Sequence, residues 1–424
     1  MRIALFSECY TPVPNGVVTS ITSLRQTLQA WGHTVYVFAP GQPQPDDDEG
    51  VFRLPELPFP RHPYHFARPF PRLHCDFEGL NVDIIHCQHP FTVGKLGAET
   101  AKKHNIPMIY TAHSRYDAML ATAKSSILRS MAPKPMLSLV RRFCAKADYV
   151  ITPSRHTRDC LRADKIRARY VVIPSGVTPP KPRTGAREHL RGRLGLKPET
   201  PIILYLGRLG PEKRLDLLLH SVAELCRKGL PAPYADFHTV LVGDGQSREE
   251  LEHLSHELGL QNRVHFTGMV PYPDVGDWYA ASDIFALPSP METQGLVIVE
   301  AMSFGLPCVT VNEGGACELI AEGETGYRVP VETHAFAGVL ERFLTNPELR
   351  EQFGEAGRER AQLYTPEAMT RKVLEVYERA LQRPRPLQET KVRLINLEIR
   401  RLKSERRRGV PRLKSSNFHL WKDD

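Results

Sequence analysis

The feature that most limits the folds open to this chain of 424 residues is a repeated alternation of short apolar runs with longer helical stretches. The apolar runs fall at residues 2–6, 34–39, 82–86, 108–111, 149–152 and 170–174 in the first half, and at 202–206, 238–242, 264–267, 284–287 and 308–311 in the second. Short runs of this kind are typical of strands buried on both faces, and their alternation with helices is typical of parallel sheets. We therefore predict an α/β protein with two doubly wound parallel sheets.

A segment rich in Pro, Arg and Gly separates the two series. Such a segment is typical of a linker, and a chain of this length exceeds what one hydrophobic core usually supports. We predict a first domain over residues 1–177, a linker over 178–200, a second domain over 201–365, a final helix over 366–381 and a basic tail over 382–424. The Pro-rich and acidic stretch between residues 39 and 82 is expected to be an irregular crossover.

The strongest chemical signal follows the apolar run 284–287 and extends from Glu292 to Glu300. If a helix begins at Gln294–Gly295, its first-turn amides have no partner within the helix and attract an anion; these are the amides of Gly295, Leu296 and Val297. Glu292 then lies beside that anion. Glu300 lies two turns deeper, with its carboxylate free to accept hydrogen bonds from a vicinal diol such as a ribose. The spacing predicts a site for a nucleotide sugar.

Two glycine-containing loops follow predicted strands and suit phosphate binding. Arg208 and Lys213 follow the strand 202–206, at the edge of a parallel sheet where α/β proteins bind ligands. Arg can bind phosphate oxygens with two parallel hydrogen bonds, and Lys supplies a compact charge. Gly16 opens a helix after the first strand and lets a ligand approach the backbone closely. The sequence GxGxxG is missing, which argues against NAD.

These residues resemble the Glu-x7-Glu motif and the Gly-Arg…Lys loop of retaining glycosyltransferases of the GT-B type. The resemblance is to family 4, which includes diacylglycerol glucosyltransferases and phosphatidylinositol mannosyltransferases, and it covers roughly residues 1–380. The start of the chain looks most like the diacylglycerol glucosyltransferase branch. The resemblance implies a GT-B fold, in which two Rossmann-like domains face each other across a cleft and the final helix crosses back onto the first domain.

The resemblance also implies roles for single residues. His113, at the end of the strand 108–111, would contact the donor sugar, Arg208 and Lys213 would neutralise the leaving diphosphate without a metal, and Glu292 would hold sugar hydroxyls. Gly268 and Val270 would belong to the loop over the nucleobase. The predicted catalytic set is His113, Arg208, Lys213 and Glu292, and the predicted donor-binding set is Gly16, Gly268, Val270, Gly295, Leu296, Val297 and Glu300.

The predicted reaction moves a hexose from a nucleoside diphosphate sugar, UDP-glucose or another, to an acceptor hydroxyl with retention of configuration. No metal and no cofactor are expected, because Arg208, Lys213 and helix amides can stabilise the leaving diphosphate. Cys and His residues lack metal-ligand spacing, and no Gly-x-Ser-x-Gly elbow occurs. No residue identifies itself as a covalent nucleophile. Front-face attack assisted by the leaving phosphate is therefore the default mechanism.

The charge distribution favours an anionic membrane surface as a partner. Residues 115–193 hold 18 Lys and Arg against 5 Asp and Glu, and residues 383–424 hold 13 against 5. Apolar residues mixed with Lys and Arg over 118–143 suit an interfacial element, with an ordinary packed helix hairpin as the alternative. The tail has the spacing of a short membrane-surface or partner helix, with disorder as the alternative. We therefore favour a membrane glycerolipid such as diacylglycerol as the acceptor.

Further features bear on the compartment and on the alternatives. The N-terminus turns polar too early for a signal peptide, no apolar run is long enough to span a membrane, and the eight cysteines form no CxxC pair. We predict a cytoplasmic protein, peripheral on the inner face of the cell membrane. Nucleic acid is not an expected partner, because the Arg-rich tail lacks the pattern of a known module. Two alternatives stay open: a glycosyltransferase acting on a soluble or cell-wall saccharide, and a catalytically silent membrane-binding protein.

Overall fold

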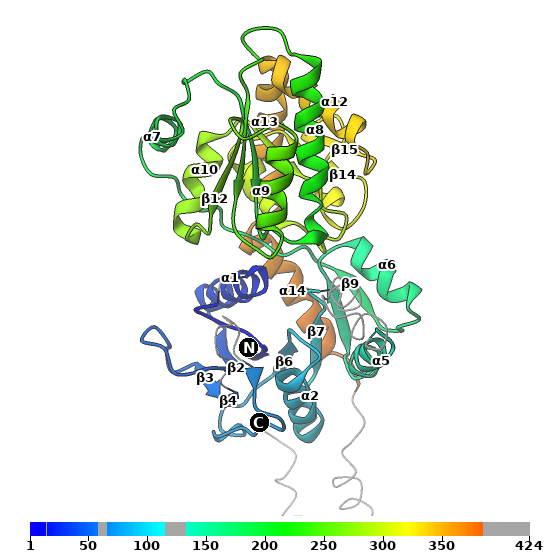
Figure 1. Ribbon diagram of the computed structural model, residues 1–424. Helices are drawn as coiled ribbons and strands as arrows, with labels where there is room; N and C mark the ends of the chain where they lie inside the picture. The colour runs from blue at the N-terminus through cyan, green and yellow to red at the C-terminus, as the bar shows by residue number, and fades with distance from the viewer. Residues whose placement is uncertain (14, 58–65, 115–132, 385–424) are drawn as a thin grey trace, which may run out of the picture. The chain divides into compact units, whose positions relative to one another are not determined.

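Two parallel sheets form the framework of the protein. The computed structural model describes residues 1–13, 15–57, 66–114 and 133–384, and residues 1–381 form one compact unit. A seven-stranded sheet has the order β3-β2-β1-β6-β7-β8-β9, and a six-stranded sheet has the order β12-β11-β10-β13-β14-β15 (Figure 1). All pairings within these two sheets are parallel, so the predicted α/β architecture with two doubly wound sheets is confirmed.

The first sheet is built from the first half of the chain. Its strands are β1 (Arg2–Phe6), β2 (Thr34–Pro40), β3 (Val51–Leu54), β6 (Ile84–Cys87), β7 (Met108–Thr111), β8 (Tyr149–Thr152) and β9 (Tyr170–Val172). The helices beside it are α1 (Gly16–Ala30), α2 (Thr92–His104), α5 (Pro133–Cys144), α6 (Arg155–Ala163) and α14 (Pro366–Leu381). A short antiparallel pair consists of β4 (Glu56–Leu57) and β5 (Phe66–Ala67). Helix α14 shares a hydrophobic cluster with α1 and β1, although it is the last helix of the compact unit.

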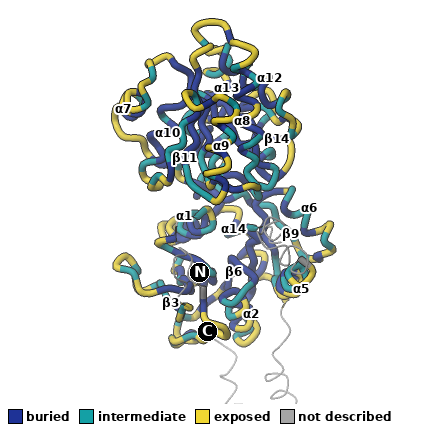
Figure 2. The backbone as a smooth tube through the Cα atoms, viewed as in Figure 1, coloured by how far each residue is buried: buried dark blue, intermediate teal, exposed yellow. Residues whose placement is uncertain are grey.

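The second sheet follows in the second half. Its strands are β10 (Ile202–Leu206), β11 (His238–Val242), β12 (Val264–Gly268), β13 (Ile284–Leu287), β14 (Cys308–Val311) and β15 (Gly326–Val329). Its helices are α7 (Ala186–Arg193), α8 (Leu215–Lys228), α9 (Arg248–Glu257), α10 (Val275–Ala281), α11 (Leu296–Ser303), α12 (Thr333–Thr345) and α13 (Pro347–Ala361). Short 3-10 turns are η1 (Pro211–Lys213), η2 (Tyr272–Asp274), η3 (Ala316–Leu319) and η4 (Gln362–Tyr364). The central strands of both sheets are buried, the edge strands β3, β9 and β12 are partly exposed, and the outer faces of the helices are exposed (Figure 2).

One prediction about the first sheet is wrong. The stretch between residues 39 and 82 was expected to be irregular, but it contains the edge strand β3, which pairs in parallel with β2. The ring of Phe52 stacks on that of Phe38, with 4.8 Å between centroids, and this apolar contact outweighs the surrounding Pro and acidic residues. One residue of the acidic run, Asp47, forms an ion pair with Arg53 of this strand at 2.7 Å.

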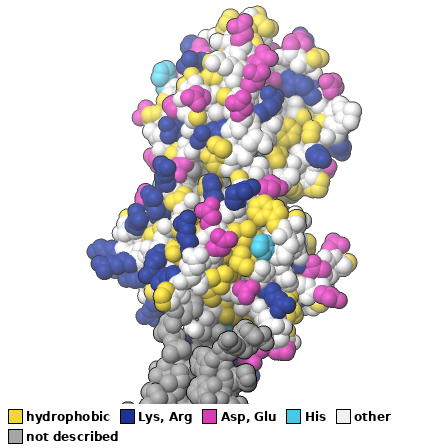
Figure 3. All heavy atoms as spheres, turned by 180° about the vertical axis from the view of Figure 1, so that it is seen from behind, with side chains coloured by type: hydrophobic (Ala, Val, Ile, Leu, Met, Phe, Trp, Pro, Cys, Tyr) yellow, Lys and Arg dark blue, Asp and Glu magenta, His cyan; other side chains and the backbone are white. Residues whose placement is uncertain are grey.

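A basic surface lies on the helices at one side of the first sheet. Figure 3 shows Lys and Arg side chains gathered over the part of the molecule that carries α5 and α6. The exposed basic residues of this surface are Lys134, Arg141, Arg142, Lys146, Arg155, Arg162, Lys165, Arg167 and Arg169. Residues 115–132, which hold much of the predicted interfacial element, and the tail from 385 onward lie outside the described residues. Among the helices that are described, none is both long and apolar enough to cross a bilayer.

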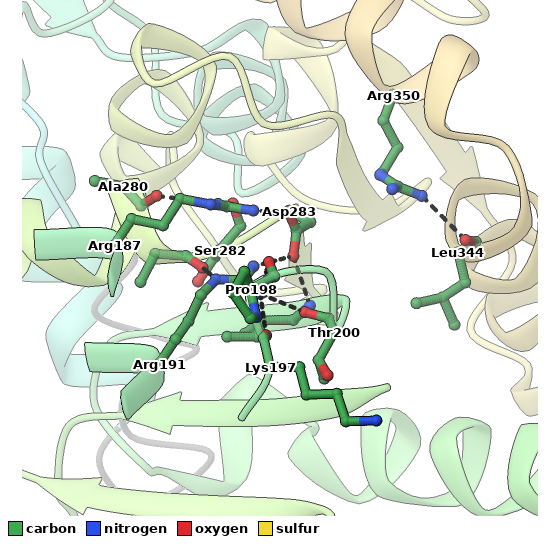
Figure 4. Close-up of polar contacts among 12 residues, drawn as sticks. Arg187, Arg191, Lys197, Pro198, Thr200, Ala280, Ser282, Asp283, Leu344 and Arg350 are labelled. Atoms are coloured by element: carbon green, nitrogen blue, oxygen red, sulfur yellow. Dashed lines mark hydrogen bonds and ion pairs between the residues drawn. The ribbon is translucent and has the colours of Figure 1, made fainter. Parts of the chain in front are cut away.

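Helix α7 lies within the predicted linker and is fixed to the second sheet by one buried guanidinium (Figure 4). Arg191 pairs with Asp283 at 2.7 Å and donates to the carbonyls of Ala281 at 3.0 Å, Pro198 at 2.9 Å and Thr200 at 2.6 Å. Asp283 also accepts from the amide of Ile202, the first residue of β10, at 2.8 Å. This network holds the amino-terminal ends of β10 and β13, because Asp283 directly precedes β13. The opposite ends of the same strands carry the candidate site.

Candidate active site

The helix predicted after β13 is present as α11, and it begins slightly later than expected. The helix begins at Leu296, and Gly295 precedes it at φ 82° and ψ 60°, in the left-handed region that favours glycine. A Cβ at Gly295 would lie 3.0 Å from Cβ of Ala316, so the site also lacks space for a side chain. Within the described part of the chain, the amides of Leu296 and Val297 donate no hydrogen bond. These two amides are available to an anion.

Neighbouring strands bring Lys213 and Glu292 into contact. Lys213 ends η1 after β10, and Glu292 follows β13, the strand that pairs with β10. The Lys213 ammonium forms an ion pair with the Glu292 carboxylate, and both side chains are mostly buried. Arg208 instead pairs with Glu212 at 2.6 Å, and its side chain is 59% exposed. Both predicted cations therefore have carboxylate partners, which an anionic ligand would have to replace.

Hydrogen bonds to the backbone fix the loops that carry these charges. The Tyr205 hydroxyl donates to the carbonyl of Arg208 at 2.9 Å, and the Ser289 hydroxyl donates to that of Glu212 at 3.1 Å. The amide of Gly315 donates to the carbonyl of Glu292 at 2.6 Å, and a Cβ at Gly315 would lie 2.0 Å from the carbonyl oxygen of Thr293. A glycine is required there because two loops of the second sheet touch through their backbones.

The carboxylate of Glu300 differs from its predicted state. It was expected to be free, but it is 4% exposed and accepts from the hydroxyls of Tyr279 at 2.7 Å and Tyr272 at 3.0 Å. Burial raises the pKa of Glu300, and the two phenol hydroxyls oppose that rise because they stabilise the charged form. Both tyrosines were missed in the sequence, since nothing in their local pattern indicates a contact with a residue 21 or more positions away.

The predicted nucleobase loop leads directly to one of these tyrosines. Strand β12 ends at Gly268, which has φ +73°, and a Cβ there would lie 3.0 Å from Nη1 of Arg248. Val270 is partly buried against the core of the second sheet, and Tyr272 follows two residues later. Gly268, Val270 and Glu300 are thus joined through the η2 segment.

His113 lies in a buried polar group at the carboxyl ends of the strands of the first sheet. Its Nε2 is 2.7 Å from Oε1 of Gln88, and its ring centroid is 6.5 Å from that of His89. Burial holds the pKa of His113 well below its usual value, with smaller contributions from His89 and His86, so the imidazole is neutral. A neutral imidazole can exchange hydrogen bonds with a sugar hydroxyl but carries no charge for a phosphate.

Glu8 belongs to the same group and was not predicted. It follows β1, and its Oε1 accepts from the first-turn amides of α2 at Val93 (2.6 Å) and Gly94 (3.4 Å). Its own amide is hydrogen-bonded to Nδ1 of His89 at 3.2 Å. Burial raises the pKa of Glu8 to about 7, against the opposing effect of those two amides and of Lys95. The rule that drew attention to Arg208, a polar side chain just after a parallel strand, would also have found Glu8.

Short contacts connect the predicted residues of the first and second sheets. Asn15 caps α1 by accepting from the amide of Val18 at 2.8 Å. A Cβ at Gly16 would lie 3.7 Å from Cδ1 of Leu296, so two predicted donor-binding residues are neighbours. The side-chain amide of Gln294 exchanges two hydrogen bonds with the backbone of Ser175, at 2.8 and 2.9 Å. Among the described contacts, none joins His113 directly to Lys213 or Glu292.

The sequence of this chain is also similar to known families and proteins. Residues 14–180 match the model of Glycosyltransferase Family 4, and residues 186–360 match that of Glycosyl transferases group 1. The alpha-monoglucosyldiacylglycerol synthase of Streptococcus pneumoniae is 30% identical over 83% of this chain and 80% of its own length. The chain belongs to family 4 of the GT-B glycosyltransferases.

Two further proteins are similar to this glycosyltransferase, one in sequence and one in fold. The alpha-monoglucosyldiacylglycerol synthase of Acholeplasma laidlawii is 28% identical over 77% of this chain and 84% of its own length. The crystal structure of HepE of Anabaena in complex with UDP has a TM-score of 0.68, with 20% identity over 89% of this chain and all of that chain. The latter likeness confirms the predicted GT-B fold of this glycosyltransferase.

The titration of Glu8 should make the stability of this glycosyltransferase depend on pH. Its pKa is about 7 in the folded protein against 4.5 ordinarily, so between these values the folded state binds more protons than the unfolded state. The free energy of unfolding therefore falls as pH rises through that window. The variant Glu8→Gln keeps the hydrogen bond to Val93 but does not titrate. We expect its free energy of unfolding, relative to that of wild type, to rise by on the order of 3 kcal/mol between pH 4 and pH 8.

Urea unfolding at several pH values measures this difference. Glu99→Gln, a change of an exposed carboxylate on α2, is the matched control and should show no such trend. A stability difference between Glu8→Gln and wild type that stays constant with pH would contradict the raised pKa.

Proposed function

We propose that this protein is a retaining hexosyltransferase that moves glucose from UDP-glucose to a membrane glycerolipid such as diacylglycerol, without a metal or cofactor. The observation that carries the proposal is the ion pair of Lys213 with Glu292 after the neighbouring strands β10 and β13. Helix α11 begins four residues after Glu292, and its first residue lies beside Gly16. This arrangement offers positive charge to a diphosphate and a carboxylate to the attached sugar. The similarity to two alpha-monoglucosyldiacylglycerol synthases supports glucose as the transferred sugar and diacylglycerol as the acceptor class. The UDP bound to HepE supports UDP as the nucleotide of the donor.

The donor would replace existing contacts as it binds. Its diphosphate takes the place of Glu292 on Lys213, and the released carboxylate turns to the sugar hydroxyls. Arg208 is exposed and can leave Glu212 to bind the same diphosphate with two hydrogen bonds. The amides of Leu296 and Val297 add the positive end of a helix. In this scheme, two cationic side chains and two backbone amides replace a divalent cation.

The transfer itself needs no protein nucleophile. The bond between the anomeric carbon and the phosphate oxygen breaks, and the acceptor oxygen bonds to the same face of that carbon. The acceptor proton passes to the departing phosphate oxygen, so the nucleoside diphosphate leaves with that proton. Charge develops on the diphosphate, which Lys213, Arg208 and the α11 amides would contact once the donor has bound, and stabilisation of this kind is often the largest catalytic contribution. Neutral His113 would orient the sugar.

Loss of either cation should slow transfer strongly. We expect Arg208→Ala and Lys213→Ala each to lower kcat/KM by about 10²–10³, the effect of removing one oriented donor to a developing anion. Activity is measured with UDP-, GDP- and ADP-sugars, with diacylglycerol or soluble saccharides, and with EDTA present throughout. Arg227→Ala, on the exposed end of α8, is the control.

Full activity in both variants would contradict the donor site. Loss of wild-type activity in EDTA would contradict the metal-free scheme. Transfer to a soluble saccharide but not to diacylglycerol would show that the acceptor is a saccharide and not the proposed lipid.

A groove between α2 and α5 supports a lipid acceptor. It has a volume of about 640 Å³ and is lined by Pro90, Lys95, Glu99, Pro135, Ser138, Leu139, Arg142, Phe143 and Lys146. Its apolar and basic residues suit a molecule with an acyl chain near anionic headgroups. Phe143 also lies 3.3 Å from the position of a Cβ at Gly94, whose amide contacts Glu8. The groove therefore adjoins the buried polar group that contains His113.

The basic surface over α5 and α6 should attach the enzyme reversibly to the inner face of the cell membrane. Each Lys or Arg near an anionic surface contributes about 1 kcal/mol, so reversing two charges should weaken binding at least about tenfold. We expect Arg142→Glu with Lys146→Glu to reduce co-sedimentation with anionic vesicles, and salt to release the wild type because the Debye length shortens from about 10 Å at 0.1 M to about 3 Å at 1 M.

The same change of charge on α8, Arg227→Glu with Lys228→Glu, is the control and should leave vesicle binding intact. Equal loss in both double variants would mean that net charge, rather than this surface, governs attachment. A wild-type protein that stays in solution with anionic vesicles at low salt would contradict attachment altogether.

A further inference from the structure

The two oxygens of the Glu300 carboxylate have partners of very different character. Oε2 accepts from Tyr279, which is fully buried in α10, at 2.7 Å. Oε1 accepts from Tyr272, which is 43% exposed in the short η2 turn, at 3.0 Å. One partner belongs to the core and the other to the surface. Of the two partners, only Tyr272 can move without opening the core.

Packing holds Tyr279 in place. Its ring stacks on Phe304, with 5.3 Å between centroids, and lies 6.0 Å from Phe285. A phenol that is surrounded in this way cannot leave without opening the core of the second sheet. Tyr279 therefore fixes the direction of the Glu300 carboxylate.

Tyr272 is held much more weakly. Its ring contacts no other aromatic ring among the described residues, and its hydroxyl is shared between Glu300 Oε1 at 3.0 Å and the carbonyl of Thr178 at 3.3 Å. A phenol hydroxyl has one proton, so it can donate fully to only one of these acceptors. Movement of Tyr272 into solvent would release Oε1 without disturbing the core.

We propose that Tyr272 is a placeholder for the donor ribose: its hydroxyl occupies Oε1 of Glu300 until a nucleotide binds, and the ribose hydroxyls then take its position. This inference rests on the proposed function and on the role predicted from the sequence for Glu300, which is to accept hydrogen bonds from the ribose diol. Buried carboxylates are costly to leave without hydrogen bonds, and Tyr272 meets that need in the empty site. Tyr272 and the ribose then compete for one oxygen, whereas Tyr279 assists ribose binding.

The two tyrosines should therefore affect nucleotide affinity with opposite signs. We expect Tyr272→Phe to bind UDP about three- to tenfold more tightly than wild type, because the competing hydrogen bond to a charged group is gone. Tyr279→Phe should bind UDP about tenfold more weakly, because the carboxylate loses its fixed direction. In a Glu300→Gln background, Tyr272→Phe should have much less effect, since residues that act through a common partner are not additive.

Calorimetric titration with UDP and with 2′-deoxy-UDP measures these effects, with GDP and ADP as further probes. The tighter binding of Tyr272→Phe should be confined to nucleotides that carry the ribose hydroxyl, so its preference for UDP over 2′-deoxy-UDP should exceed that of wild type. Tyr234→Phe, a partly buried tyrosine elsewhere on the second sheet's domain, is the matched control. Thermal melting establishes that each variant is folded.

The outcomes separate two kinds of failure. If Tyr272→Phe binds UDP as weakly as Tyr279→Phe, or shows no change, Tyr272 is not a placeholder and the inference is overturned. If instead the wild type binds none of the nucleotides, or Glu300→Gln retains full affinity and full discrimination against 2′-deoxy-UDP, the proposed role of Glu300 has failed.

Discussion

The parallel direction of the strands is the constraint on which the candidate site depends. All strands of one parallel sheet end at the same edge, so loops that are far apart in sequence meet there. Lys213 and Glu292 are 79 residues apart, but they form an ion pair because β10 and β13 are neighbours in the sheet. In the first sheet the same geometry gathers Glu8, His89 and His113 after β1, β6 and β7. Buried strands supply a rigid support, and the loops supply the chemistry.

Protein groups satisfy the charges of the site when no ligand is present. Lys213 neutralises Glu292, Arg208 neutralises Glu212, and two tyrosines solvate the buried Glu300. These contacts stabilise the folded site because unpaired charges out of water are costly. Under the proposed function, donor binding exchanges them for contacts with diphosphate, sugar and ribose. Such an exchange limits the net free energy of donor binding. It also directs the cations to the place where charge develops during transfer.

Much of the fold could be predicted because buried parallel strands are nearly continuous apolar runs, which the strands β1, β7, β8, β10, β11, β13 and β14 show clearly. Strand β3 escaped prediction because its four residues lie in a Pro-rich and acidic context, and its pairing with β2 and the ring contacts of Phe52 appear only in the folded protein. Helix α11 begins after the predicted position because Gly295 adopts a left-handed conformation that sequence alone does not reveal.

The pairing of site residues was harder to predict than their presence. Glu292, Glu300, Arg208 and Lys213 stood out by position after strands or at a helix start. Their partners did not, because Tyr272 and Tyr279 reach Glu300 from elements that become neighbours only in the folded protein. Glu8 could have been found, since it follows β1 directly, but its capping of α2 depends on a contact across 85 residues.

In the proposed mechanism, a diphosphate leaves from the site formed by Lys213 and α11 while the acceptor attacks the same face of the sugar. Nuclear magnetic resonance of the glycolipid made from UDP-glucose and diacylglycerol, with EDTA present, tests it most directly through the configuration at the anomeric carbon. Because the donor is an α-glucoside, same-face attack predicts an α-linked product. A β-linked product would contradict retention and the front-face mechanism built on it.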